Sequence, residues 1–118
     1  MSQKILVVDD DPAIGDVLQL ILKEEGYEVE IQTNGQGAWQ LQAPFPGLLL
    51  LDIRLSGMDG RTICQHLKSQ ASTRQVPIII ISATKGAQQI ASEAGADDFI
   101  AKPFELRDML AMVTKYIR

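Results

Sequence analysis

Acidic residues stand at the ends of two apolar runs in this sequence. The run KILVV at 4–8 is followed by Asp9 and Asp10, and the four leucines at 48–51 are followed by Asp52. If both runs are parallel strands in neighbouring positions, their carboxyl ends lie at one edge of a sheet, and the three carboxylates meet there. Carboxylates so close together repel one another, and Mg²⁺ relieves that repulsion. The pattern therefore indicates a magnesium site.

A hydroxyl and an amine occupy comparable positions further along the chain. Ser82 ends the run VPIIIIS at 76–82, and Lys102 follows the short run DDFIA at 97–101. Together with the acids they form a polar cluster at the ends of otherwise apolar strands. Asp11 has a different expected role, because it precedes Pro12 at the start of a predicted helix, where a carboxylate caps the backbone N–H groups.

The elements that must position these residues alternate between strand and helix. Apolar runs predict strands, and apolar residues at helical spacing predict the segments between them. This alternation favours an α/β flavodoxin-like domain over residues 1–118, a doubly wound, five-stranded parallel sheet of order 2-1-3-4-5 with helices on both faces. The predicted strands are 4–8, 27–31, 48–51, 76–82 and 97–101, and the predicted helices are 12–25, 35–42, 60–70, 86–94 and 104–118.

Several side chains of the predicted helices have expected positions. In the last helix, one stripe is predicted to face the core, and it consists of Leu106, Leu110, Val113 and Ile117. A second stripe is either the flank of that core or a partner surface, and it consists of Met109, Met112 and Tyr116. Trp39 and Cys64 are expected to pack in the core, with His66 on the surface.

Composition narrows the function classes. The net charge of −4 argues against nonspecific nucleic-acid binding, which depends on basic patches. Cys64 is the single cysteine, so neither an intrachain disulfide nor a cysteine-based metal site is expected. There is no apolar stretch of the roughly 20 residues needed to span a membrane, and the N-terminus does not resemble a secretory signal. A cytoplasmic location is expected.

Four motifs together are similar to a known family. The segments VVDDDP, LLDIRLSGMDG, IIIISA and GADDFIAKPF resemble the receiver domain of bacterial two-component response regulators, including the chemotaxis regulators, over residues 4–117. The resemblance implies that Asp52 accepts a phosphoryl group from a phosphohistidine. It also implies that Mg²⁺ is held by Asp9, Asp10, Asp52 and the backbone carbonyl of Arg54.

The resemblance assigns further roles. Lys102 and Ser82 would contact the phosphoryl group, and Ser82 with Phe99 would form the switch that follows phosphorylation. Arg54 and Thr84 would tune the rate of dephosphorylation, and the Lys102–Pro103 peptide bond is expected to be cis. Ser56 departs from the family, which usually has proline at this position, so the loop after Asp52 is expected to be less rigid.

The implied partners are a histidine kinase or a histidine phosphotransfer protein. The face formed by the fourth helix, fifth strand and fifth helix would serve output or a phosphorylation-dependent dimer, with an unknown target and no direct contact with nucleic acid or membrane. Such a domain catalyses its own phosphorylation and slow dephosphorylation but is not a turnover enzyme. Two alternatives remain: a Mg²⁺-dependent phosphohydrolase with an aspartate nucleophile, which usually has a second aspartate where Arg54 stands, and a receiver-like interaction module that accepts no phosphate.

Overall fold

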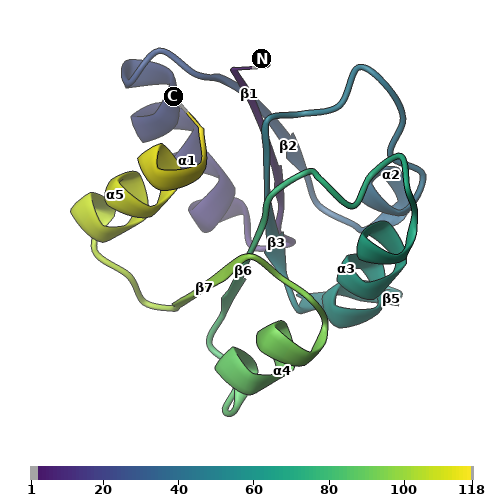
Figure 1. Cartoon of the computed structure of the whole chain (residues 1–118). Coiled ribbons are helices and arrows are strands. Elements are labelled where there is room, and N and C mark those ends of the chain that lie inside the picture. The colour runs from purple at the N-terminus through teal and green to yellow at the C-terminus, as the bar shows by residue number, and fades with distance from the viewer. Residues whose placement is uncertain (1–2, 118) are drawn as a thin grey trace.

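The protein is described by a computed structural model over residues 3–117. Its centre is a five-stranded parallel sheet of order β2-β1-β3-β6-β7, which confirms the predicted order 2-1-3-4-5 (Figure 1). The central strands are buried along their length, as expected for a parallel sheet covered on both faces. The strands are β1 (Lys4–Val8), β2 (Glu28–Gln32), β3 (Leu48–Asp52), β6 (Ile78–Ser82) and β7 (Asp98–Ala101).

In the described part of the chain, five helices cover the sheet in two groups. Figure 1 shows α1 and α5 on one side and α2, α3 and α4 on the other. Asp11 caps α1 as predicted, since its carboxylate accepts a hydrogen bond from the N–H of Ala13 at 3.0 Å. Asp59 caps α3 in the same way through the N–H of Arg61 at 2.8 Å. The helices are α1 (Pro12–Glu24), α2 (Gln36–Trp39), α3 (Gly60–Ser69), α4 (Ala87–Glu93) and α5 (Leu106–Tyr116).

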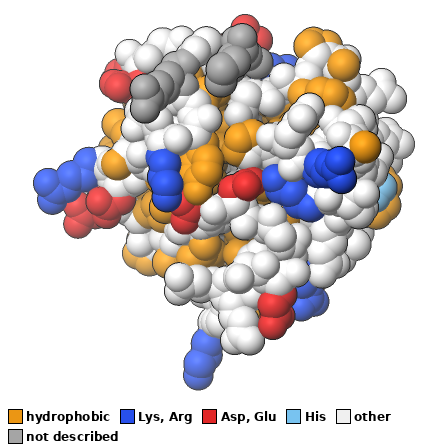
Figure 2. All heavy atoms as spheres, in the orientation of Figure 1, with side chains coloured by type: hydrophobic (Ala, Val, Ile, Leu, Met, Phe, Trp, Pro, Cys, Tyr) orange, Lys and Arg blue, Asp and Glu red, His pale blue; other side chains and the backbone are white. Residues whose placement is uncertain are grey.

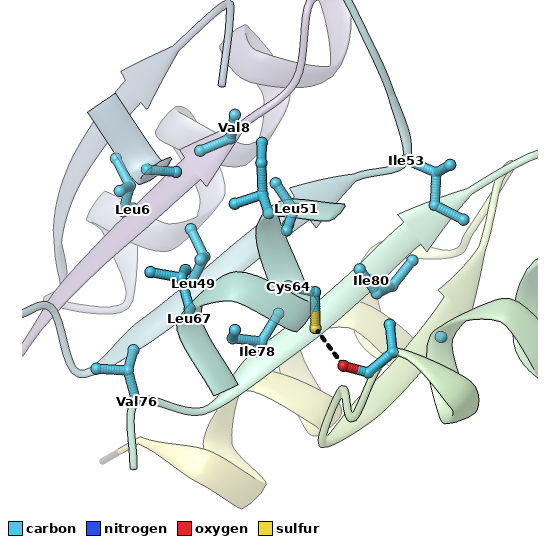
Figure 3. Close-up of a cluster of buried hydrophobic side chains, with 14 of the residues drawn as sticks. Leu6, Val8, Leu49, Leu51, Ile53, Cys64, Leu67, Val76, Ile78 and Ile80 are labelled. Carbon is cyan, nitrogen blue, oxygen red and sulfur yellow. Dashed lines mark hydrogen bonds between the residues drawn. The ribbon is translucent and has the colours of Figure 1, made fainter. Parts of the chain in front are cut away.

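The sheet separates two hydrophobic cores, because successive side chains of a strand point to opposite faces. Leu49 and Leu51 of β3 pack with α2, α3 and α4, whereas Leu48 and Leu50 pack with α1 and α5. Figure 3 shows the first of these cores, in which the thiol of Cys64 donates to the carbonyl of Ala94 at 3.5 Å. Burial raises the pKa of this thiol to about 11, which suits the packing role expected for Cys64.

A short hairpin that was not predicted follows β3. β4 (Arg54–Leu55) and β5 (Met58–Asp59) pair antiparallel around Gly57, whose φ of 74° favours glycine. Gly60 comes next and lies against the backbone of Asp52, where a Cβ atom would stand 2.0 Å from the Asp52 carbonyl oxygen. The hairpin and the start of α3 are therefore packed directly beneath the end of β3.

The prediction for the core face of α5 was partly wrong. Met109 is fully buried beside Val113 and Ile117, whereas Leu106 is 45% exposed. Leu106 is the first residue of α5, and the buried residues of the helix begin one turn later, at Met109. Leu110 of the first stripe is half-buried, and so are Met112 and Tyr116 of the second. The second stripe therefore contributes Met109 to the core, while Met112 and Tyr116 form its flank.

The prediction for the second helix was also too long. α2 ends at Trp39, and the Trp39 ring is half-buried and stacks on His66 of α3 with ring centroids 3.6 Å apart. On the face drawn in Figure 2, acidic and basic side chains are intermixed with hydrophobic ones. Across residues 3–117, none of the helices has the length and apolar character required to cross a lipid bilayer.

Candidate functional site

The register of the sheet brings the predicted acids together. Val8 of β1 pairs with Leu51 of β3, so the residues that follow them, Asp9 and Asp52, lie side by side. Asp10 stands next to them, and one carboxylate oxygen from each of the three residues lies within 4.8 Å of the others. Asp9 and Asp52 are buried, and Asp10 is exposed.

Lys102 joins this cluster from the far edge of the sheet. Its Nζ atom lies 2.7 Å from Oδ2 of Asp9 and 3.2 Å from Oδ2 of Asp52. The backbone holds the lysine in place, since the N–H of Lys102 donates to the carbonyl of Ser82 at 3.0 Å. The Lys102–Pro103 peptide bond is cis, as expected from the resemblance.

The charged groups of the cluster shift the pKa values of one another. Burial, and then the neighbouring carboxylate of Asp9, raise the pKa of Asp52, although Lys102 opposes this. Burial by itself would lower the pKa of Lys102, but the carboxylates of Asp9 and Asp52 outweigh burial and raise it. A buried acid pair sharing one lysine is short of positive charge, because two carboxylates face one ammonium.

The oxygen atoms of the cluster suit a hard divalent cation. Oδ1 of Asp9 accepts a hydrogen bond from the N–H of Asp11 at 2.9 Å, and within residues 3–117 the partner found for the buried Oδ2 of Asp9 is the Lys102 ammonium, at 2.7 Å, which it shares with Asp52. Buried oxygen atoms normally have a partner. Carboxylate oxygens from Asp9, Asp10 and Asp52 are the ligand type that Mg²⁺ prefers.

A cavity of about 250 Å³ opens beside Asp52. Ser82 and Lys102 line it, as do Arg54 and Thr84, so the structure brings these predicted site residues to one place. The Ser82 hydroxyl oxygen accepts a hydrogen bond from the N–H of Thr84 at 2.9 Å. This leaves its own proton free to donate into the cavity.

Phe99 does not line this cavity. Its half-buried ring packs against the core beneath α4 and lines a separate surface hollow of about 190 Å³ with Gln88 and Ala91 of α4. The switch role assigned to Ser82 and Phe99 therefore stays a prediction, and the structure holds the two residues in different surroundings.

Sequence reasoning missed two residues near Asp52. Lys85 lines the cavity and is exposed, so it adds a positive charge there. Its position three residues after the end of β6 is the sequence feature that could have indicated this. Gly60 supports the Asp52 backbone by close packing. No sequence pattern marked this contact, because it depends on the unpredicted hairpin.

Comparison with known proteins places the chain in a family. Residues 5–114 match the response regulator receiver domain family. The chain is 38% identical over 98% of its length to the DNA-binding dual master transcriptional regulator RpaA of Synechocystis sp., and it spans about half (49%) of that relative.

Solved structures give the same result. The chain is similar to the BeF₃-activated N-terminal receiver domain of Klebsiella pneumoniae RstA, with a TM-score of 0.86, 32% identity and 98% of each chain covered. It is similar to the receiver domain of the Pseudomonas aeruginosa sensor histidine kinase PA1611, solved with magnesium in its active site cleft, with a TM-score of 0.86, 29% identity and 98% of each chain covered. The chain therefore belongs to the response regulator receiver domains of two-component signalling.

Proposed function

We propose that Asp52 is the phosphoacceptor of this receiver domain. The observation that supports this most strongly is the shared position of the buried Asp52 carboxylate, the Lys102 ammonium and the Ser82 hydroxyl at one open cavity. In the proposed step, an oxygen of Asp52 attacks phosphorus, the N–P bond of the phosphohistidine donor breaks, and its electron pair stays with the imidazole nitrogen.

The residues around Asp52 would stabilise the charge of the phosphoryl group. Phosphoryl transfer depends mainly on in-line positioning and on neutralising the equatorial oxygens. Lys102 would bind one of those oxygens after leaving its contact with Asp52 Oδ2, and Ser82 would donate its hydroxyl proton to another. Arg54 and Thr84 also line the cavity, where they would control the approach of hydrolytic water.

Asp9, Asp10, Asp52 and the backbone carbonyl of Arg54 would hold Mg²⁺. When bound, the cation would supply positive charge that this cluster lacks. Asp10 is the most exposed of the three acids, so we expect it to complete the site from the solvent side.

The partners remain part of the proposal. A receiver domain interacts with histidine kinases and output domains, and a histidine kinase or histidine phosphotransfer protein would donate the phosphoryl group here. The face formed by α4, β7 and α5 would then serve output or dimerisation. Self-catalysed phosphorylation and slow dephosphorylation without multiple turnover, and the cytoplasmic location, remain predictions.

Intact mass spectrometry tests the phosphoacceptor directly. The chain would be incubated with acetyl phosphate and Mg²⁺, and we expect a mass gain of one phosphoryl group. The gain should vanish in Asp52→Asn and persist in Asp16→Asn, a matched change at an exposed position of α1. No gain in the native chain would favour the interaction module, and continuous hydrolysis of unrelated phosphomonoesters would favour the phosphohydrolase.

The rate-tuning role of Arg54 has its own test. After removal of the phosphodonor, the phosphorylated fraction of Arg54→Ala should decay at a measurably different rate from that of the native chain. Equal decay rates would contradict the role proposed for Arg54 and leave the phosphoacceptor assignment intact.

A further inference from the structure

A second cleft lies beside the phosphoacceptor cavity. It has a volume of about 540 Å³ and lies between the β4–β5 hairpin, the first turn of α3, and α4. Arg54 and Thr84 line both the cleft and the cavity, so the two hollows are adjacent. None of the roles assigned to the phosphoacceptor residues uses the far part of this cleft.

The floor of the cleft is apolar. Leu55 and Met58 of the hairpin and Ile90 of α4 are each half-buried, and all three also pack against the core beneath. They are anchored on one side and open to solvent on the other. Covering partly exposed apolar side chains in a concave surface with an apolar group is favourable, because it removes their surface from water.

The rim of the cleft is positively charged. Arg54 and Arg61 both line it, and both residues are exposed. Within residues 3–117 no carboxylate forms an ion pair with Arg54. Asp59 is the one acid in the lining, and it is already engaged, because it caps α3 and its Oδ2 lies 3.4 Å from Nη2 of Arg61.

This local charge contrasts with the rest of the protein. The lining carries two cations and one anion, whereas the whole chain has a net charge of −4. A free phosphate or a nucleic-acid backbone would pair with the arginines but leave the apolar floor uncovered. An acidic protein segment with one apolar side chain would satisfy both parts of the cleft, and arginine and methionine are enriched in protein interfaces of this kind.

We propose that the cleft lined by Arg54, Arg61, Met58 and Ile90 docks an acidic segment of a partner protein, whose apolar side chain packs on the floor between the two arginines. The proposal concerns the unphosphorylated chain. It therefore stands or fails independently of phosphotransfer to Asp52.

The test uses a labelled peptide with two glutamates on each side of one leucine, and measures fluorescence anisotropy at low ionic strength without phosphodonor. We expect saturable binding to the native chain. Arg61→Gln should weaken binding about fivefold, the effect of losing an exposed ion pair. Arg74→Gln, at an exposed position in the α3–β6 loop outside the cleft, is the matched control and should bind as the native chain does.

Two further measurements separate docking from nonspecific charge attraction. A peptide with serine in place of leucine should bind more weakly than the leucine peptide. In methyl NMR spectra of the native chain, the leucine peptide should shift the signal of Ile90 and leave that of Ile14, on α1, unchanged. The proposal is overturned if the native chain shows no saturable binding, if Arg61→Gln and Arg74→Gln bind equally, or if Ile90 does not respond.

Discussion

The Lys102 ammonium lies 2.7 Å from the Asp9 carboxylate and so connects the ends of two strands that β3 and β6 separate in the sheet. The contact is nearer than the one between Lys102 and Asp52, at 3.2 Å. The side chain of Asp9 is fully buried and that of Lys102 is 16% exposed, so this pair is shielded from solvent. Lys102 thus stabilises the acidic cluster as a whole and not Asp52 alone.

Asp52→Asn should stabilise the metal-free chain at neutral pH. The pKa of Asp52 is raised by burial and by Asp9, so its ionised form destabilises the folded state. As pH falls, the folded state of the unsubstituted chain binds this proton at a higher pH than the unfolded state does. Its stability therefore rises as pH falls through the folded pKa toward the ordinary value of 3.8. Urea unfolding in EDTA should show a gain on the order of 1 kcal/mol near pH 7 that shrinks toward about pH 4.

Asp16→Asn is the control for this measurement, since Asp16 is exposed on α1. Its free energy of unfolding should follow that of the native chain across the same pH range. If Asp52→Asn were instead less stable than the native chain near pH 7, burial of the Asp52 carboxylate and its repulsion by Asp9 would not outweigh its pairing with Lys102.

Gly60→Ala should be strongly destabilising. The new Cβ atom would lie 2.0 Å from the Asp52 carbonyl oxygen and 2.8 Å from Cα of Ile53, so the backbone of β3 or the start of α3 must move. We expect a loss of about 2–3 kcal/mol in urea unfolding, together with weaker Mg²⁺ binding by calorimetry.

Gly57→Ala, in the same hairpin, separates steric contact from backbone conformation. Gly57 has a φ of 74°, but no heavy atom of residues 3–117 beyond its chain neighbours lies within 4 Å of an added Cβ atom. This variant should lose only about 1 kcal/mol and keep its Mg²⁺ affinity. Equal losses at the two glycines would show that the contact between Gly60 and Asp52 is not what matters.

Met109→Ala and Leu106→Ala should differ in stability despite their closeness on α5. Met109 is fully buried, so its truncation should cost about 3 kcal/mol, whereas Leu106 is 45% exposed and should cost less than about 0.5 kcal/mol. Thermal unfolding followed by circular dichroism measures both. A larger loss for Leu106→Ala than for Met109→Ala would instead support the core face predicted from helical spacing.

The phenol of Tyr116 should lose its proton at a higher pH than an ordinary tyrosine does. Its hydroxyl donates to Oδ2 of Asp98 at 2.8 Å, and burial followed by this hydrogen bond raises the pKa of Tyr116 to about 12. Ultraviolet absorbance titration of Tyr27→Phe, which leaves Tyr116 as the one tyrosine, should show this midpoint. Asp98→Asn in the same background should lower it, because the negative charge is removed.

The same group makes stability depend on alkaline pH. Above the ordinary tyrosine value of 10.0, the unfolded chain loses this proton while the folded chain keeps it, so stability is lost as pH rises. The stability of Tyr116→Phe should fall less over this interval than that of the native chain. A midpoint near the ordinary value would mean that the Asp98 contact does not persist in solution.

The sequence predicted the sheet well because the central strands are long and apolar. The runs at 48–51 and 78–82 are buried on both faces, and such runs carry a strong signal. Strand order then placed Asp9, Asp52, Ser82 and Lys102 at one edge, as the structure confirms.

Short and irregular elements could not be predicted in the same way. The strands of the β4–β5 hairpin have two residues each, too few for any periodicity, and the contact of Gly60 with Asp52 follows from that hairpin. Likewise, helical spacing along α5 defines two adjacent stripes but does not say which of them faces the sheet. In the structure, Met109 of the second stripe is buried. The closer pairing of Lys102 with Asp9 depends on side-chain reach and has no counterpart in the sequence pattern.

The division of the interior by the sheet has a practical consequence for protein engineering. Leu48 and Leu50 pack on one side of the sheet and Leu49 and Leu51 on the other, so the buried side chains form two separate clusters. The α1/α5 compartment can therefore be redesigned for heat resistance without touching the side chains beneath α3 and α4. The redesigned protein would be more stable and would keep the cavity, the hairpin and the cleft lined by Arg54 and Arg61 unchanged.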